Sequence, residues 1–115
     1  MNDGTYNAFI ERTTLGFDYD GRIFSLWLHL RGDGWGQGFG GHTLDDRCEI
    51  GEERPGTQEG HQYIINVLRT LEVDYWEDLK GKPIRFKSVN GTIEGIGHYY
   101  KDKWFYPKDL WKDDE

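Results

Sequence analysis

Alternating apolar and polar positions predict two long β-strands at the start of the chain. In residues 22–31, every second side chain is large and apolar: Phe24, Leu26, Leu28 and Leu30. Because successive side chains of a strand point to opposite faces, this segment has one apolar face for a core. Residues 6–19 read as the preceding strand, and Asp20-Gly21 between the two is typical of a hairpin turn.

A third strand is predicted after another Asp-Gly turn, and it is rich in glycine. Glycine occupies every second position from residue 32 to residue 40, so one face of this strand is bare backbone. A two-residue turn fixes the register and sets Trp27 opposite Gly40 and Arg31 opposite Gly36. Two interpretations stay open: Trp27 covers the glycines of its own sheet, or the bare backbone receives a planar ligand beside Arg31.

One amphipathic helix is predicted at about residues 58–73. Its apolar side chains recur at helical spacing: Tyr63, Ile64, Val67, Leu68 and Leu71. Thr57 is a plausible N-cap for it. The polar segment before it, residues 45–58, is expected to be the longest loop, and one short extra turn is expected at residues 76–79.

A second hairpin is predicted at about residues 83–100, because Asn90-Gly91 is the strongest short turn signal. Residues 104–111 follow as an aromatic edge, with a short strand at 104–106 and a final turn. The expected register pairs Phe86 with Gly95 and Ile84 with Gly97 on one face, and Lys87 with Glu94 on the other, where Arg85 and His98 also lie.

These elements predict a single α+β domain over residues 1–115, with a mostly antiparallel, twisted sheet of five to six strands and one main helix packed against it. A chain of 115 residues suits one modest core.

The composition of the chain limits the kinds of partner that the protein is expected to bind. The net charge is −7, from 21 acidic and 14 basic residues, which argues against a long nucleic acid. Aromatic residues make up 16% of the chain, so some are expected at an interface or in a pocket. With a polar start and no run of about 20 apolar residues, we expect a soluble, cytoplasmic protein without a membrane segment.

No catalytic or metal-binding set is recognisable in the sequence. Cys48 is the only cysteine and has no identifiable base. The four histidines show no paired metal-ligand spacing, and we expect no cofactor. If the chain were a small enzyme acting on nucleotides, His98 or Glu94 would be the candidate general base.

The predicted start of the helix is a candidate anion site. Its unpaired N–H groups suit a phosphate, and Gly60 lets a ligand approach the backbone. Arg54 just before it offers a forked, charge-assisted contact. The alternative is ordinary capping of the helix by Thr57, and Glu59 in the same turn would repel an anion.

Several segments taken together resemble a known family. They are Gly36-Gln-Gly-Phe-Gly-Gly41, Gly56-Thr-x-x-Gly60, Val73-Asp-x-Trp-Glu-Asp-Leu-x-Gly81, Ile93-x-x-Ile96-Gly-His98 and Trp104-Phe-x-Pro107. This ordered series, from about residue 15 to 107, resembles the phage-encoded Thoeris anti-defence sponge family of the first type described.

The resemblance implies a non-enzymatic protein of the infected host's cytoplasm. Members of that family sequester cyclic ADP-ribose isomers made by bacterial TIR-domain enzymes, so that the defence effector is not activated. They work as homo-oligomers built on dimers, with pockets at the subunit interface, and some also bind cyclic oligonucleotide signals at separate sites. Arg contacts the diphosphate, and aromatic and Asn-type side chains contact the adenine.

Local chemistry suggests which residues of this chain play those parts. Arg54 and Arg85 are expected on the diphosphate, and Thr57, Gly60, Tyr63, Trp104, Asn90, Gly40 and Gly41 complete the expected site. In it the helix start assists at Thr57 and Gly60, Tyr63 and Trp104 stack, Asn90 bonds the adenine, and Gly40 and Gly41 allow close approach. A different reading of the same charge and aromatic content is an inhibitor that binds a host defence protein.

Overall fold

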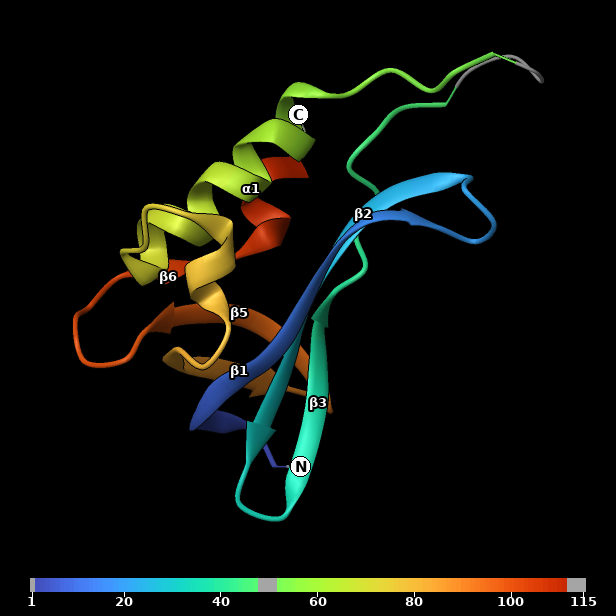
Figure 1. Cartoon of the computed structure of the whole chain (residues 1–115). Helices are drawn as coiled ribbons and strands as arrows, with labels where there is room; N and C mark the ends of the chain where they lie inside the picture. The colour runs from blue at the N-terminus through green and yellow to red at the C-terminus, as the bar shows by residue number, and fades with distance from the viewer. Residues whose placement is uncertain (1, 48–51, 112–115) are drawn as a thin grey trace.

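The computed structural model describes residues 2–47 and 52–111 and shows an α+β fold (Figure 1). One six-stranded antiparallel sheet has the order β3-β2-β1-β4-β5-β6. The strands are β1 Gly4–Asp18, β2 Ile23–Gly32, β3 Trp35–Gly40, β4 Pro83–Val89, β5 Thr92–His98 and β6 Trp104–Phe105. Helix α1 (Gln58–Leu71) covers one face, with the short 3₁₀ turns η1 (Trp76–Leu79) and η2 (Pro107–Trp111) beside it. The predicted fold class is confirmed.

The core lies between α1 and the face of the sheet toward it, called here the inner face. Tyr63, Val67 and Leu71 of α1 are fully buried. They meet apolar side chains from alternate strand positions, among them Leu26, Leu28, Leu30, Ile84, Phe86 and Ile96. No helix of residues 2–47 and 52–111 covers the other, outer face of the sheet, so its side chains form a separate surface (Figure 1).

The two N-terminal hairpins follow the sequence closely. The predicted register of β2 and β3 is confirmed, with Trp27 opposite Gly40 and Arg31 opposite Gly36. The first turn is longer than expected: it takes the four residues 19–22, because Tyr19 and Asp20 both adopt left-handed conformations with φ of 58° and 60°. As a result β2 begins at Ile23.

The predicted register of the second hairpin is wrong by one residue. A β-bulge between Lys87 and Ser88 shifts the pairing, so that Lys87 faces Gly95 and not Glu94. Beyond the bulge, the observed pairs are Phe86 with Ile96, Arg85 with Gly97, and Ile84 with His98. The physical reason is that Ile93 and Ile96 are both buried although they stand three positions apart. A regular strand would send them to opposite faces, and an extra residue brings both to the core.

The bulge also moves His98. It was expected beside Arg85 and Lys87, but it lies on the inner face and is only 5% exposed. Arg85 and Lys87 instead face the outer side opposite two glycines, Gly97 and Gly95. This exchange determines the chemistry of the outer face.

Helix α1 begins as predicted and ends earlier. Thr57 is its N-cap, and the helix stops at Leu71 because Glu72 adopts a left-handed conformation with φ of 58°. The polar loop before the helix is closed by a bridge between Asp45 and Gly56. Cys48 lies outside the described residues.

Candidate functional site

The predicted residues at the start of α1 serve the fold. The N–H of Gly60 donates to Thr57 Oγ1 at 2.9 Å, and the Thr57 hydroxyl donates to the Leu44 carbonyl at 3.0 Å. A Cβ added at Gly60 would lie 2.1 Å from the Leu44 carbonyl oxygen, so this glycine allows the helix to pack on Leu44. Ordinary capping by Thr57 is therefore the interpretation that the structure bears out.

Arg54 lies near this helix start and is engaged with an acidic residue. Its Nη2 donates to Asp45 Oδ1 at 2.9 Å. Burial alone would raise the pKa of Asp45, but the hydrogen bonds from Arg54 and from the Phe24 N–H hold that pKa below its ordinary value. The ion pair fixes the base of the polar loop.

Tyr63 is fully buried and offers no ring face to solvent. It meets Phe105 edge-on at 4.9 Å between ring centroids, and its hydroxyl lies 3.0 Å from His42 Nδ1. Burial raises the pKa of the Tyr63 phenol well above its ordinary value. Tyr63 is a core residue, whereas stacking on a ligand was expected.

The glycines at the end of β3 approach their own chain. A Cβ at Gly40 would lie 2.2 Å from the Leu26 carbonyl oxygen, and one at Gly41 would lie 2.4 Å from the Trp27 ring. Trp27 also lies over Gly38, where a Cβ would come within 3.1 Å of the ring. The Trp27 ring therefore covers Gly38 and Gly41 of its own chain.

Asn90 occupies the exposed turn between β4 and β5 with φ of 53°. Its N–H donates to Asp3 Oδ1 at 2.8 Å. The turn is thereby tied to the start of the chain.

Arg85 and Trp104 are brought together on the outer face, and two residues that sequence reasoning missed lie beside them. We call Arg85, Lys87, Trp104 and Tyr106 the outer shelf. Arg85 Cζ lies 4.9 Å from the Trp104 ring centroid, and Lys87 Nζ lies 4.5 Å from it. Lys87 Nζ also donates to Tyr106 Oη at 2.5 Å. Such cation–π contacts hold positive charge next to a flat aromatic surface.

The two glycines of β5 explain why the rings of the shelf lie flat. A Cβ at Gly97 would come within 2.5 Å of the Trp104 ring, and a Cβ at Gly95 within 2.6 Å of the Tyr106 ring. The alternation of Arg85 with Lys87 and of Trp104 with Tyr106 was a signal for this arrangement. This signal can be recognised only when the bulge is known, because the bulge sets Gly95 and Gly97 opposite the two cations.

An open depression lies on the outer face, beside the strand position of Arg85. It has a volume of about 510 Å³, and its lining includes Asn7, Phe9, Arg31, Pro83 and Tyr99. Phe9 and Tyr99 are 42% and 45% exposed. Because Asn7 pairs with Arg85 and Phe9 pairs with Arg31, strand geometry sets the two arginine Cα atoms about 12 Å apart. Arg31 lines the depression and is paired with Glu11, to whose Oε2 its Nε donates at 2.8 Å, whereas Arg85 lies beside the lining residue Asn7 on the neighbouring strand.

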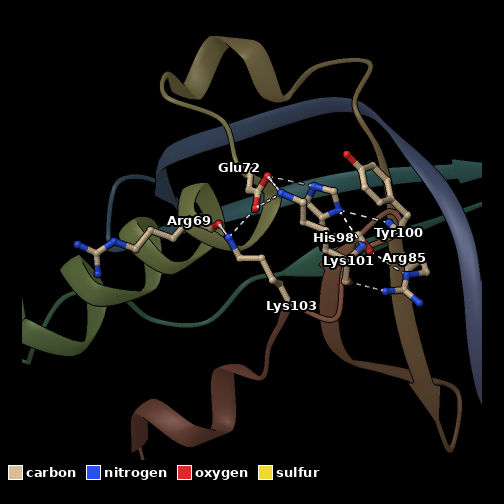
Figure 2. Close-up of polar contacts among 7 residues, drawn as sticks. All are labelled: Arg69, Glu72, Arg85, His98, Tyr100, Lys101 and Lys103. Atoms are coloured by element: carbon tan, nitrogen blue, oxygen red, sulfur yellow. Dashed lines mark hydrogen bonds and ion pairs between the residues drawn. The ribbon is translucent and has the colours of Figure 1, made fainter.

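Arg85 is held by the loop that follows β5 (Figure 2). Its Nε donates to the His98 carbonyl at 2.8 Å, and its Nη2 donates to the Lys101 carbonyl at 2.7 Å. Arginine has five N–H donors, and no other acceptor among the described residues takes the remaining three. These donors are available to an anion.

The candidate general bases are already engaged. His98 Nδ1 accepts the N–H groups of Tyr100 and Lys101, and its Nε2 lies 3.5 Å from Glu72 Oε1. Burial lowers the pKa of His98, and nearby lysines lower it further against the opposing effect of Glu72. Glu94 forms an ion pair with Lys108 at 3.1 Å.

Within residues 2–47 and 52–111, no group of three His, Cys, Asp or Glu side chains is arranged to hold a metal ion. In the same ranges, no helix has the length and apolar character needed to cross a membrane. Comparison of the chain with protein-family models, with curated proteins and with solved structures found no match.

Proposed function

We propose that this protein is a non-enzymatic phage anti-defence sponge, which binds cyclic ADP-ribose-type signalling nucleotides and thereby blocks Thoeris immunity. The observation that carries the proposal is the outer face of the sheet, where Arg31, Phe9 and Tyr99 line a depression and Arg85 pairs with the lining residue Asn7. A cyclic ADP-ribose isomer needs cations for its diphosphate and a flat surface for its base. The resemblance of the sequence to the sponge family supports the same ligand class.

The chemistry of this face favours binding over turnover. The donors of Arg85 suit phosphate oxygens, because guanidinium and phosphate form charge-assisted hydrogen bonds. His98, whose carbonyl accepts from Arg85, is buried and has both ring nitrogens facing protein partners. A ligand held here would be released unchanged.

The magnitudes favour a pocket closed by a second copy of the chain. Two charge-assisted contacts contribute about 1.5–3 kcal/mol each, and two stacked rings about 1–3 kcal/mol each. Their sum of roughly 5–12 kcal/mol is opposed by an association cost of at least about 4 kcal/mol. Nanomolar binding requires about 12 kcal/mol. We therefore propose a homodimer or higher oligomer in which the partner covers the depression.

Titration calorimetry with cyclic ADP-ribose isomers tests the proposal. The wild-type protein is expected to bind at least one isomer, and the ligand recovered after heating the complex is expected to be intact. Arg85→Met, which keeps the apolar stem and removes the guanidinium, is expected to weaken binding. No heat with any isomer or with a cyclic oligonucleotide at micromolar protein would refute the proposal, and a chemically altered ligand would indicate an enzyme.

A second candidate function has an observation of its own. Figure 1 shows the β1–β2 hairpin extending beyond α1, and Leu15, Phe17 and Tyr19 near its tip are 39%, 65% and 69% exposed. Exposed apolar side chains on an acidic protein are typical of a protein-binding surface. Capture of one stoichiometric host protein by the wild-type chain, lost in Phe17→Ser, would favour an inhibitor of a host defence protein over the sponge.

A further inference from the structure

The loop that holds Arg85 is itself tied to the end of α1 on the opposite face of the sheet. Residues 99–103 join the end of β5 to the start of its antiparallel neighbour β6, at one end of the sheet (Figure 2). Glu72, the residue that ends α1, points its carboxylate at this loop. The two faces of the sheet are therefore connected through one short segment.

The Glu72 carboxylate contacts three side chains and forms ion pairs with two of them, Lys101 and Lys103. Lys101 Nζ lies 2.9 Å from Glu72 Oε1, and Lys103 Nζ lies 2.9 Å from Glu72 Oε2. His98 Nε2 lies 3.5 Å from the same carboxylate. Lys103 Nζ additionally donates to the Arg69 carbonyl at 2.9 Å, which ties the loop to the last turn of the helix. A carboxylate shared among several cations is a network, which orders a surface more than a single exposed pair does.

Two of the three residues that contact Glu72 also hold Arg85. Arg85 donates to the carbonyls of His98 and Lys101, and the side chains of those same two residues reach Glu72. His98 adds a third link, because its Nδ1 accepts the N–H of Lys101 at 3.1 Å and that of Tyr100 at 3.3 Å. On each of the two paths, a single residue, His98 or Lys101, connects Glu72 at the helix end to the guanidinium of Arg85.

We infer that Glu72 is a positioning residue for the ligand site: through His98 and Lys101 it fixes the loop carbonyls that orient the guanidinium of Arg85 toward an anionic ligand. The identity of the ligand in this inference rests on the proposed function, whereas the contacts that link Glu72 to Arg85 do not. A free arginine loses side-chain entropy when it binds, and a guanidinium already fixed by two carbonyls loses less. Glu72 thus favours binding without touching the ligand.

The test replaces Glu72 by Gln, which removes the charge and keeps the shape. Glu59→Gln is the matched control, because it removes the same charge from the first turn of the same helix. Lys101→Met is a second probe that keeps the Lys101 carbonyl. With cyclic ADP-ribose as the probe ligand, Glu72→Gln and Lys101→Met are expected to raise Kd about tenfold, and Glu59→Gln to leave it unchanged.

A double-mutant cycle separates positioning from a general loss of stability. In an Arg85→Met background, Glu72→Gln is expected to have no further effect on Kd, because the residue through which it acts is gone. Equal effects of Glu72→Gln in both backgrounds would overturn the inference.

A readout without ligand distinguishes failure of the inference from failure of the proposed function. The Arg85 Nε–H signal in a ¹H–¹⁵N spectrum, assigned by its loss in Arg85→Met, reports the bond to the His98 carbonyl. We expect this signal to exchange with water faster in Glu72→Gln, while that of Arg31, which is bonded to Glu11, stays unchanged. An unchanged Arg85 signal overturns the inference. A changed signal in a protein that binds no nucleotide upholds the geometry and refutes the proposed function.

Discussion

The same substitution at two glycines of the sheet is expected to have opposite effects on stability. A Cβ added at Gly97 would lie 2.5 Å from the Trp104 ring, so the ring must move. At Gly36 the nearest atom to an added Cβ is the Leu30 carbonyl oxygen at 3.5 Å, which is ordinary contact. Gly97→Ala therefore forces the Trp104 ring to repack. Gly36→Ala fits without such a change and only reduces the backbone freedom of the unfolded chain.

The magnitudes follow from these contacts. Overpacking costs about 1–3 kcal/mol, and displacing Trp104 also removes its contacts with Arg85 and Lys87, each worth about 0.5–1 kcal/mol at an exposed site. We expect Gly97→Ala to lower the free energy of unfolding by about 2 kcal/mol. Gly36→Ala is expected to raise it by about 0.4–1 kcal/mol, because alanine restricts the unfolded chain.

Urea unfolding followed by far-ultraviolet circular dichroism measures both changes. A domain of this size shifts its Tm by about 4 °C for each 1 kcal/mol, so the two variants should differ by about 10 °C in a thermal scan. The fluorescence of folded Gly97→Ala should also change, because Trp104 leaves the cations. Equal stability of the two variants would refute the description of the outer shelf.

Four further predictions concern the core, the helix start, His98 and Glu72. Tyr63→Phe is expected to cost about 0.5–1.5 kcal/mol, since it removes the part-buried hydrogen bond between the Tyr63 hydroxyl and His42. Tyr63→Ala is expected to cost about 3–5 kcal/mol, since it leaves a cavity in the core. Chemical denaturation distinguishes the two variants, and equal costs would contradict the described burial. Thr57→Ala is expected to cost about 1 kcal/mol and Thr57→Ser much less in the same assay, because Ser keeps the cap. Because the folded pKa of His98 is lowered by burial, its contribution to stability is present above the unfolded pKa of about 6.5 and is lost as the pH falls through the lower folded value. The free energy of unfolding should fall accordingly in the wild type and less steeply in His98→Gln. The pKa of Glu72 is lowered to about 2, chiefly by the hydrogen bonds from Lys101 and Lys103, so its contribution disappears only between about pH 4.5 and pH 2.

Local signals in the sequence were sufficient for most elements. The turn before β3 fixed its register, and the helical spacing with Thr57 located α1. Tyr63 shows that one residue can receive two incompatible roles: its place in the apolar stripe predicted the core, and its ring suggested ligand stacking. The structure agrees with the stripe, because burial is decided by the helix face and not by the chemistry of one side chain.

The candidate site was less predictable because it depends on long-range assembly. Pairing of β1 with β4 joins Asn7 to Arg85 and so creates the depression on the outer face, and no local pattern specifies that neighbour. The bulge beside Ser88 sets which side chains share a face with Arg85. The spacing of Ile93 and Ile96 was the one clue to it.

The most direct test of the central claim is a titration of ¹⁵N-labelled protein with cyclic ADP-ribose isomers, observed through the indole N–H signals of its five tryptophans. Those of Trp27 and Trp76 are bonded to Asp18 and Thr13 and serve as internal references. We expect the Trp104 signal to shift with at least one isomer and the two reference signals to remain in place. A shift confined to Trp27, or no shift of any tryptophan at saturating ligand, would contradict this expectation.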